Sequence, residues 1–493
     1  MALWIAAFVT LFLLVFHRGG LTGTDEGTLY DQTASFAERG EVAVPPLFHT
    51  YTGRDGRIYS QYAFGQAVLA LPFYAVGDLL DDYGPQKLRL VLAGPGGVLG
   101  GRLFRGPQVF TVLLLPFVMT GFMAGVFYLF QRLLGVAAHF AAVATLATIL
   151  TTYLAYTSGF FLRHSAETAT ILVAYYCFAR FARGGSRRFL LLGSTFASLT
   201  FLIRLPAGVA AIALAGFLAW VLHVRFGIFR DAGAWRTQKF RQAMLTLAAP
   251  LGVSLAVHLY GNYVRWGTLL ETPYWELSGF STPLSLGGVA NLVSPGSSVF
   301  LYSPLLLLVP FLVAAAWRRE RALCAAALVN FFVFWLFYSL YDHWTGLWSA
   351  PGPRYLTATI PLLLLPLGLW LQGADRVRRI LFSGVAFLGL LVQISLMATH
   401  WGAIVDEMGY MNLGSPEFPF AFVLIPNMSP VLAALRFFFR GELNGMWLVQ
   451  LGVGWPGFEG APGAAWALGS VWVLALVLCG RRVWAALDRD VDE

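Results

Sequence analysis

The sequence predicts an all-α protein that crosses a membrane many times. Of its 493 residues, 58% are hydrophobic and 12% are charged, and the mean hydropathy is +0.68. Soluble globular domains carry about 25% charged residues. Apolar runs recur from end to end, too many for one buried core. These observations predict one polytopic transmembrane domain over residues 1–493, with no soluble domain appended.

About twelve membrane spans are predicted from the apolar runs. They cover residues 1–17, 107–131, 136–157, 166–182, 189–203, 205–223, 242–261, 298–316, 322–340, 355–371, 380–398 and 465–480. The first run lacks the basic start and the small-residue cleavage site of a signal peptide, so we interpret it as an uncleaved span. Arg204 and Pro206 interrupt one apolar run that is too long for a single crossing, which predicts a tight helical hairpin with Arg204 at its outer tip.

Basic residues indicate the orientation of these spans. The clusters fall between alternate spans, at residues 183–188, 225–241, 317–321, 375–379 and 480–482. Positively charged loops stay in the cytoplasm, so the net charge of +8 is explained by topology and not by a nucleic-acid surface. Three long segments then face outside, at 17–106, 262–297 and 399–464. Residues 63–77, short and containing Pro72, predict an interfacial or re-entrant helix.

An acidic pair opens the first outer segment. Asp25 and Glu26 follow the first span, and Thr28 with Asp31 has the spacing of a capping box. We expect a short helix from there to Gly40, with the acidic pair just before it. The helix dipole would favour ionised carboxylates, which could accept a proton from a hydroxyl or bind a metal. The alternative is that both acids are solvated cap residues.

Two further outer segments carry polar candidates. Tyr59 and Tyr62 lead into the interfacial helix, a suitable entry for a sugar or a lipid head group. His164 and Glu167 are three residues apart, so they share one helix face, with Arg163 beside them. Such a pair binds a metal or orients a substrate, but more often it is only the polar start of a helix.

Arg354 lies at the outer end of a predicted span. An arginine there is costly without a partner, and a lipid phosphate is a natural one. The competing interpretation is a structural ion pair with Asp342, and Arg204 invites the same two readings. Trp344 belongs either to an interfacial aromatic belt or to a sugar-stacking surface.

Several of these segments occur in an order that resembles a known family. They are the acidic pair after the first span, "GRDGRIYSQY", "SPGSSVFLYSPLLLL" and "WSAPGPRYL". Together they resemble the bacterial GT-C glycosyltransferases, in particular the protein mannosyltransferase and aminoarabinose transferase-like group, from the first to the eleventh span. The sequence departs from the pattern at "IRLPAG", where many relatives have a lysine before the proline. It also lacks the large soluble domain of the oligosaccharyltransferase-type members.

The resemblance implies an enzyme of the bacterial inner membrane. It would transfer a hexosyl or pentosyl group from a polyprenyl-phosphate donor to a lipid, glycan or protein acceptor at the periplasmic or exterior face. Asp25 would be the catalytic base and Glu26 its neighbour. The donor phosphate would bind Arg354, Arg204 and Arg163. The substrate-binding residues would be His164, Glu167, Asp342, His343, Tyr59, Tyr62, Trp344 and Tyr355. No cofactor is certain; a divalent metal ion (Mg or Mn), if used, would bind Asp25, His164 and Glu167.

Two other functions are compatible with a polytopic membrane protein. A transporter or flippase of lipid-linked sugars would usually place ionisable residues at mid-membrane, on broken helices in paired repeats. Here the acids cluster at one face and no repeat is evident, which favours an enzyme. A non-catalytic assembly partner would tolerate neutralisation of every acid named above.

Overall fold

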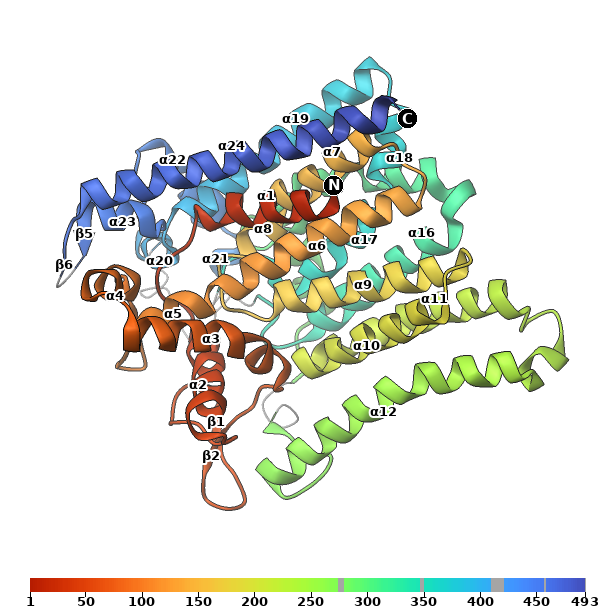
Figure 1. Cartoon of the computed structure of the whole chain (residues 1–493), viewed down its shortest axis with the longest axis horizontal. Coiled ribbons are helices and arrows are strands. Elements are labelled where there is room, and N and C mark those ends of the chain that lie inside the picture. Colours follow the sequence, from red (N-terminus) through yellow and green to blue (C-terminus); the bar gives the residue numbers. More distant parts are fainter. Residues whose placement is uncertain (274–278, 346–349, 409–420, 456–457, 493) are drawn as a thin grey trace.

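Long helices lie side by side through most of the molecule (Figure 1). The structure is a computed structural model that describes the whole chain except residues 274–278, 346–349, 409–420, 456–457 and 493. The helices of the bundle are α1 (Ala2–Leu14), α5 (Pro107–Val112), α6 (Leu114–Leu133), α7 (Ala138–Leu150), α8 (Tyr153–Thr157), α9 (His164–Ala182), α10 (Arg187–Ile203), α11 (Ala210–Phe226), α12 (Gln238–Trp266), α16 (Val309–Leu340), α17 (Ile360–Leu364), α18 (Leu367–Gln372), α19 (Arg376–Ala398) and α24 (Pro462–Asp492). The 3₁₀ turns η1 (Leu205–Val209), η3 (Pro304–Leu308) and η4 (Arg354–Thr359) precede α11, α16 and α17.

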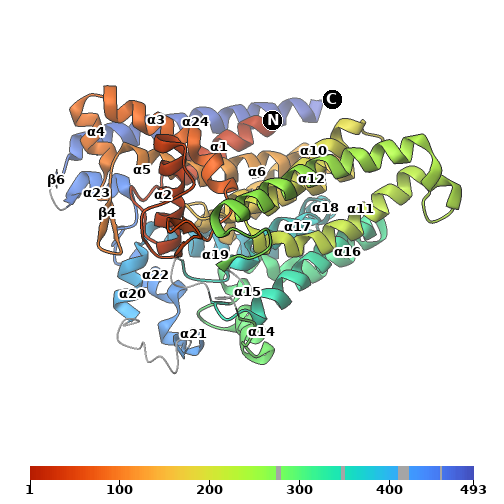
Figure 2. The same ribbon diagram turned by 90° about the horizontal axis from the view of Figure 1, so that it is seen from below.

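Shorter elements gather mainly at one end of the bundle (Figures 1 and 2). They are α2 (Thr24–Arg39), α3 (Gly65–Tyr83), α4 (Gln86–Ala93), α14 (Leu284–Val293), α15 (Val299–Tyr302), α20 (Trp401–Met408), α21 (Ala421–Leu424), η5 (Pro426–Met428), α22 (Pro430–Phe439) and α23 (Trp447–Val453). Three antiparallel hairpins join them, β1 (Thr50–Thr52) with β2 (Ile58–Ser60), β3 (Gly97–Leu99) with β4 (Arg102–Phe104), and β5 (Gly454–Trp455) with β6 (Phe458–Glu459). The turn η2 (Ala232–Arg236) precedes α12.

Six helical segments are long and apolar enough to cross a membrane. Within the described residues they are Pro107–Leu133, Leu205–Phe226, Gln238–Trp266, Pro304–Leu340, Arg376–Ala398 and Pro462–Leu487. The predicted spans 1–17 and 136–157 form shorter apolar helices, α1 and α7. The chain is therefore an all-α integral membrane protein, as its composition predicted.

Close packing between helices depends on small side chains. α1 crosses α6 at Gly121, where a Cβ atom would lie 2.6 Å from the carbonyl oxygen of Ala6. Only glycine allows this approach of two backbones, a common way for helices to pack inside a bilayer. This contact holds α1 against α6, and the acidic segment follows α1 in the chain.

Two predicted interruptions of apolar runs occur in the structure. The backbone of Arg204 is extended (φ −153°, ψ 110°) and separates α10 from η1, as predicted for a hairpin. Glu320 has non-helical angles (φ −128°, ψ 40°) and breaks α16 between the two spans predicted there. The side chain of Arg204 is buried at the turn between α10 and η1.

The first outer helix begins earlier than predicted. α2 starts at Thr24, not Thr28, and Gly40 ends it in the left-handed conformation (φ 62°). Asp25 and Glu26 therefore lie within the first helical turn. The capping-box interpretation failed because Glu26, three residues after Gly23, accepts the Gly23 N–H at 2.8 Å and is the residue that caps the helix.

The basic segments and α2 lie at opposite ends of the bundle (Figure 1). The α9–α10 and α11–α12 connections and the C-terminus are at the end away from α2. Arg102 lies in the predicted outer segment 17–106, against the positive-inside rule, and it pairs with the buried Asp31 at 2.8 Å, which gives it a structural role there.

We expect single cysteines to report this sidedness. In a background without Cys177, Cys324 and Cys479, all buried, Gly373→Cys should react with an impermeant maleimide only from the cytoplasm and Gly463→Cys only from outside. An added Cβ meets nothing within 4 Å at either position. Labelling of Gly373→Cys from outside intact cells would contradict the orientation.

Candidate functional site

A cavity of about 530 Å³ opens where α2, α9, η1 and η4 meet. Its charged and histidine lining residues are Asp25, His49, Arg163, His164, Arg204, His343 and Arg354. Its tyrosines are Tyr51, Tyr62, Tyr338, Tyr341 and Tyr355. Sequence analysis named eight of these residues from segments far apart in the chain, and the fold brings them to one cavity.

Asp25 is the only carboxylate in the cavity lining among the described residues. The first turn of α2 holds it, and its side chain is buried. Its Oδ2 lies 3.2 Å from Nη1 of Arg354. Its Oδ1 lies 3.1 Å from Nε2 of His49 and accepts a hydrogen bond from the Tyr62 hydroxyl at 2.7 Å.

These contacts determine the charge of Asp25. Burial works to raise its pKa, but the guanidinium of Arg354 and the contact with His49 outweigh burial and hold the pKa well below the usual range. Asp25 is therefore an ionised carboxylate that is partly neutralised by a neighbouring cation.

Glu26 is directed away from the cavity and into the protein. Its Oε2 accepts the backbone N–H groups of Thr22 (2.7 Å) and Gly23 (2.8 Å), and its Oε1 accepts that of Phe161 (2.5 Å). Burial raises the pKa of Glu26, and these N–H groups oppose the shift. Glu26 thus ties α2 to the segment before α9, which favours a structural role over the chemical role that the sequence suggested.

Arg204 and Glu167 form a second buried pair beside the cavity. Nη1 of Arg204 donates to Oε2 of Glu167 at 2.8 Å, and Nδ1 of His164 lies 3.5 Å from the same oxygen. His164 and Glu167 share a face of α9, as their spacing predicted. Glu167 does not line the cavity. It forms an ion pair with Arg204 outside the cavity lining.

Aromatic rings form one wall of the cavity. Tyr338 and Tyr355 stack with centroids 4.6 Å apart and planes 10° apart. The guanidinium of Arg204 lies 4.9 Å from the Tyr355 ring centroid, and that of Arg163 lies 4.0 Å from the Tyr62 centroid. Such cation–π contacts position an arginine without using all of its N–H groups.

Arg354 retains donor capacity beyond its pair with Asp25. Its Nη2 donates to the Tyr355 hydroxyl at 3.2 Å, but its buried Nε makes no hydrogen bond within the described part of the chain. With Arg163 and Arg204 nearby, three guanidinium groups and one carboxylate are present in the described lining of the cavity. This balance suits an anionic ligand.

Solved structures with the same architecture are known. No family model matches the sequence, and neither does any curated protein. ArnT from Cupriavidus metallidurans bound to undecaprenyl phosphate is similar over 91% of this chain and 77% of that chain, with a TM-score of 0.50 and 15% identity. Its apo state matches over 91% and 76%, with the same score and identity. The oligosaccharyltransferase AglB from Archaeoglobus fulgidus matches over 84% and 58%, with a TM-score of 0.49 and 13% identity.

The chain has the GT-C fold. Its match to the two ArnT structures covers most of both chains, and the fold implied by the sequence motifs is thereby confirmed.

Four of the predicted substrate-binding residues lie outside the lining of the GT-C cavity. They are Tyr59, Glu167, Asp342 and Trp344. The Tyr59 hydroxyl donates to Oδ2 of Asp55 at 2.7 Å, and Trp344 is buried in the core. The interpretation of Asp342 as the partner of Arg354 was wrong. Asp342 accepts hydrogen bonds from Ser281, which lower its pKa, and Asp25 takes the place at Arg354.

Sequence analysis missed His49 and Tyr338 in this GT-C site. Tyr338 lies inside a predicted span, where one tyrosine among apolar residues carries no signal. His49 lies in an unpatterned loop, and its place becomes evident only from the fold. Its φ of 58° makes it the one non-glycine residue with a positive φ in the described ranges. Such a backbone costs on the order of 1 kcal/mol and persists where its surroundings enforce it.

A divalent metal ion does not fit the predicted ligands of this GT-C protein. Asp25 and Glu167 are each paired with an arginine, and within the described ranges no three histidine, cysteine or acidic side chains are grouped to hold a metal ion. A guanidinium lies where the cation would have to bind.

We therefore expect the activity of the purified protein to survive metal removal. Incubation with excess EDTA, followed by transfer into metal-free buffer, should leave turnover within about twofold, because the arginines already supply positive charge at both carboxylates. Turnover in the chelated sample, with and without added Mg²⁺ or Mn²⁺, is the measurement. A loss of turnover that added Mg²⁺ or Mn²⁺ reverses would contradict the pairing of both carboxylates with arginines.

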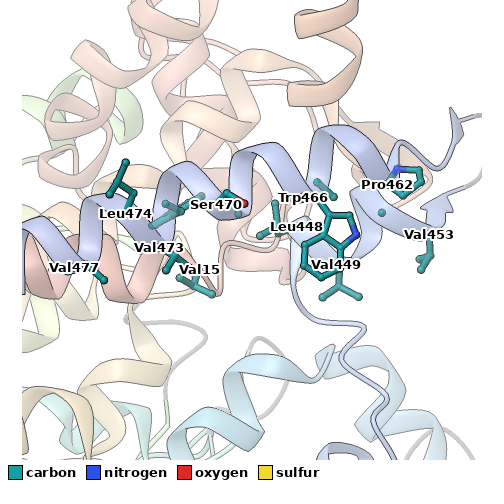
Figure 3. Close-up of a pocket in the computed structure, with 14 residues that line it drawn as sticks. Val15, Leu448, Val449, Val453, Pro462, Trp466, Ser470, Val473, Leu474 and Val477 are labelled. Carbon is teal, nitrogen blue, oxygen red and sulfur yellow. The ribbon is translucent and has the colours of Figure 1, made fainter.

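A larger hollow, of about 860 Å³, lies between α1, α23 and α24 (Figure 3). Apolar side chains such as Val449, Trp466 and Leu474 line it, and among the described residues no titratable side chain does. Because chemistry needs groups that carry charge or protons, the smaller cavity around Asp25 is the candidate active site of this GT-C fold.

Proposed function

We propose that the protein is a glycosyltransferase that uses a polyprenyl-phosphate-linked sugar as its donor. The observation that carries this proposal is the contact between the ionised Asp25 and Arg354 in a cavity lined by two further arginines. One carboxylate beside several guanidinium groups matches a reaction in which a hydroxyl is activated and a phosphate departs.

The arginines would hold the lipid phosphate. Arg354 offers an unused Nε, and Arg163 and Arg204 flank the same space. Guanidinium groups bind phosphate oxygens in pairs of hydrogen bonds, and the charge that develops on the leaving phosphate strengthens them in the transition state. The ArnT structure with undecaprenyl phosphate contains a ligand of this class, which supports the choice of donor.

Asp25 would supply the negative charge on the acceptor side. It contacts Arg354 and shares the cavity with Arg163 and Arg204, so a hydroxyl acceptor beside Asp25 and a phosphate on the arginines could approach the same sugar. Attack from the side of Asp25, with departure toward Arg354, is an inverting displacement. The stacked Tyr338 and Tyr355 rings offer an apolar face of the kind on which sugar rings pack.

The position of the site suggests where the reaction takes place. α2, which carries the cavity residue Asp25, lies at the end of the bundle opposite the basic connections (Figure 1), which by the positive-inside rule would be the periplasmic or exterior face of a bacterial inner membrane. The acceptor would be a lipid, glycan or protein hydroxyl at that surface, and the sugar a hexosyl or pentosyl group.

A reconstituted assay distinguishes transfer from transport. Purified protein in lipid nanodiscs would receive polyprenyl-phosphate donors that carry different radiolabelled sugars, with extracted envelope lipids and glycans as acceptors. We expect label on an acceptor and free polyprenyl phosphate in equal amounts. Proteoliposomes that move the intact donor across the bilayer without releasing sugar would instead identify a flippase.

A further inference from the structure

His49 combines a constrained backbone with a place in the active-site cavity. Its φ is positive, and its carbonyl oxygen accepts the Gln61 N–H at 3.1 Å, so the loop is fixed on both sides of the β1–β2 hairpin. The ring lines the cavity, with Nε2 3.1 Å from Oδ1 of Asp25. Residues held in uncommon conformations cluster at functional sites.

The two ring nitrogens of His49 have different surroundings. Nε2 faces the carboxylate of Asp25 and lies 3.4 Å from the Thr24 hydroxyl oxygen. A nitrogen that faces a carboxylate carries the proton, so in the neutral ring the lone pair is on Nδ1. No described residue makes a hydrogen bond to Nδ1, and the side chain is 36% exposed. Nδ1 is therefore available to a ligand.

Asp25, in contrast, has few free acceptor positions. Oδ1 accepts a hydrogen bond from the Tyr62 hydroxyl and contacts Nε2 of His49, and Oδ2 contacts Nη1 of Arg354. A carboxylate stabilised from three sides as an anion is a weak proton acceptor. It is well suited to orient a neighbouring imidazole and to stabilise the positive charge that forms on it.

We propose that His49 takes the proton from the acceptor hydroxyl and that Asp25 acts as its positioning residue. The inference deepens the proposed function and depends on it. The acceptor oxygen forms a bond to the anomeric carbon while the bond from that carbon to the phosphate oxygen breaks. The bonding electron pair leaves with the polyprenyl phosphate. The hydroxyl proton moves to Nδ1 of His49 and later passes to solvent.

Among the described residues, Asp25 on α2 lies 3.1 Å from Nε2 of the His49 ring, and the centroid of the Tyr62 ring, after β2, lies 5.7 Å from that of His49. Arg163, before α9, contacts the Tyr62 ring, and Arg354, at the start of η4, contacts Asp25. Asp25 is the one acid among them, and it is the group in direct contact with the ring. The imidazolium formed in the reaction would be stabilised by this carboxylate.

Chemical rescue tests the inference. We expect His49→Ala to lower kcat at least 100-fold, and added imidazole to recover at least tenfold of that loss. Binding of decaprenyl phosphate should stay within about twofold of wild type, because the arginines are unchanged. Asp25→Asn should not respond to imidazole. His139→Ala, an exposed histidine at the start of α7, is the matched control and should keep wild-type turnover.

The outcomes separate this inference from the proposed function. Full turnover of His49→Ala beside an inactive Asp25→Asn would show that Asp25 takes the proton itself. A loss that imidazole does not relieve, in protein of unchanged thermal stability, would overturn the role of His49 as a proton acceptor. Absence of transfer by the wild-type protein with every donor would refute the proposed function itself.

Discussion

Asp25→Asn should lower the turnover of sugar transfer by about 10²- to 10⁴-fold. The substitution keeps the size of the side chain and removes the charge that faces Arg354 and His49. An asparagine can no longer act as a base or stabilise an imidazolium on its neighbour. The readout is label transferred from a polyprenyl-phosphate donor at saturating substrate.

Stability has to be measured beside this activity. Asp25 is buried, contrary to the surface position that the sequence suggested, so its loss leaves Arg354 without its carboxylate. We expect the free energy of unfolding to fall by about 1–3 kcal/mol. Asp55→Asn, an exposed acid in the same segment, makes the same chemical change away from the cavity and should retain turnover. Wild-type turnover in Asp25→Asn would return this acid to a helix-cap role.

Arg354→Ala should weaken binding of polyprenyl phosphate by about 10- to 100-fold. The estimate corresponds to a hydrogen bond to a charged group, about 1.5–3 kcal/mol. Arg354→Lys should recover part of the affinity, because lysine restores the charge but not the paired N–H groups. Equilibrium binding of a fluorescent polyprenyl phosphate to protein in nanodiscs is the measurement.

A surface arginine provides the comparison for this variant. Arg57 forms an ion pair with Glu41 outside the cavity, and Arg57→Ala should bind donor normally. If Arg354→Ala and Arg354→Lys both bind as well as wild type, the pair with Asp25 is purely structural and the phosphate is held elsewhere.

Hydrophobicity and charge predicted the fold because they act locally. An apolar run identifies a span wherever it occurs, and Arg204 and Glu320 interrupt apolar runs where the structure has breaks. The start of α2 was misplaced because two capping patterns overlap in sequence. The sequence allowed either Glu26 or Asp31 to be the acidic residue that caps the helix. The structure has Glu26 as the cap, whereas Asp31 pairs with Arg102.

The site was predicted in part, for a related reason. Asp25, Arg204 and Arg354 are charges near membrane spans, and the cost of burying charge makes them conspicuous. Their partners were not predictable, because Glu167 and Asp25 meet these arginines only across the fold. His49 could not be predicted, because a single histidine in a loop belongs to no periodic pattern and to no cluster of charged residues.

The residues that line the cavity come from the first part of the chain. Every described residue that lines it lies between Asp25 and Tyr355. As the polypeptide is synthesised, all of these side chains have been made before α17 emerges, and the described residues after Tyr355 add support around them without entering the lining. We therefore expect changes at the described residues of that last part to act on folding, membrane residence or the approach of an acceptor, and not on the groups proposed to bind the donor.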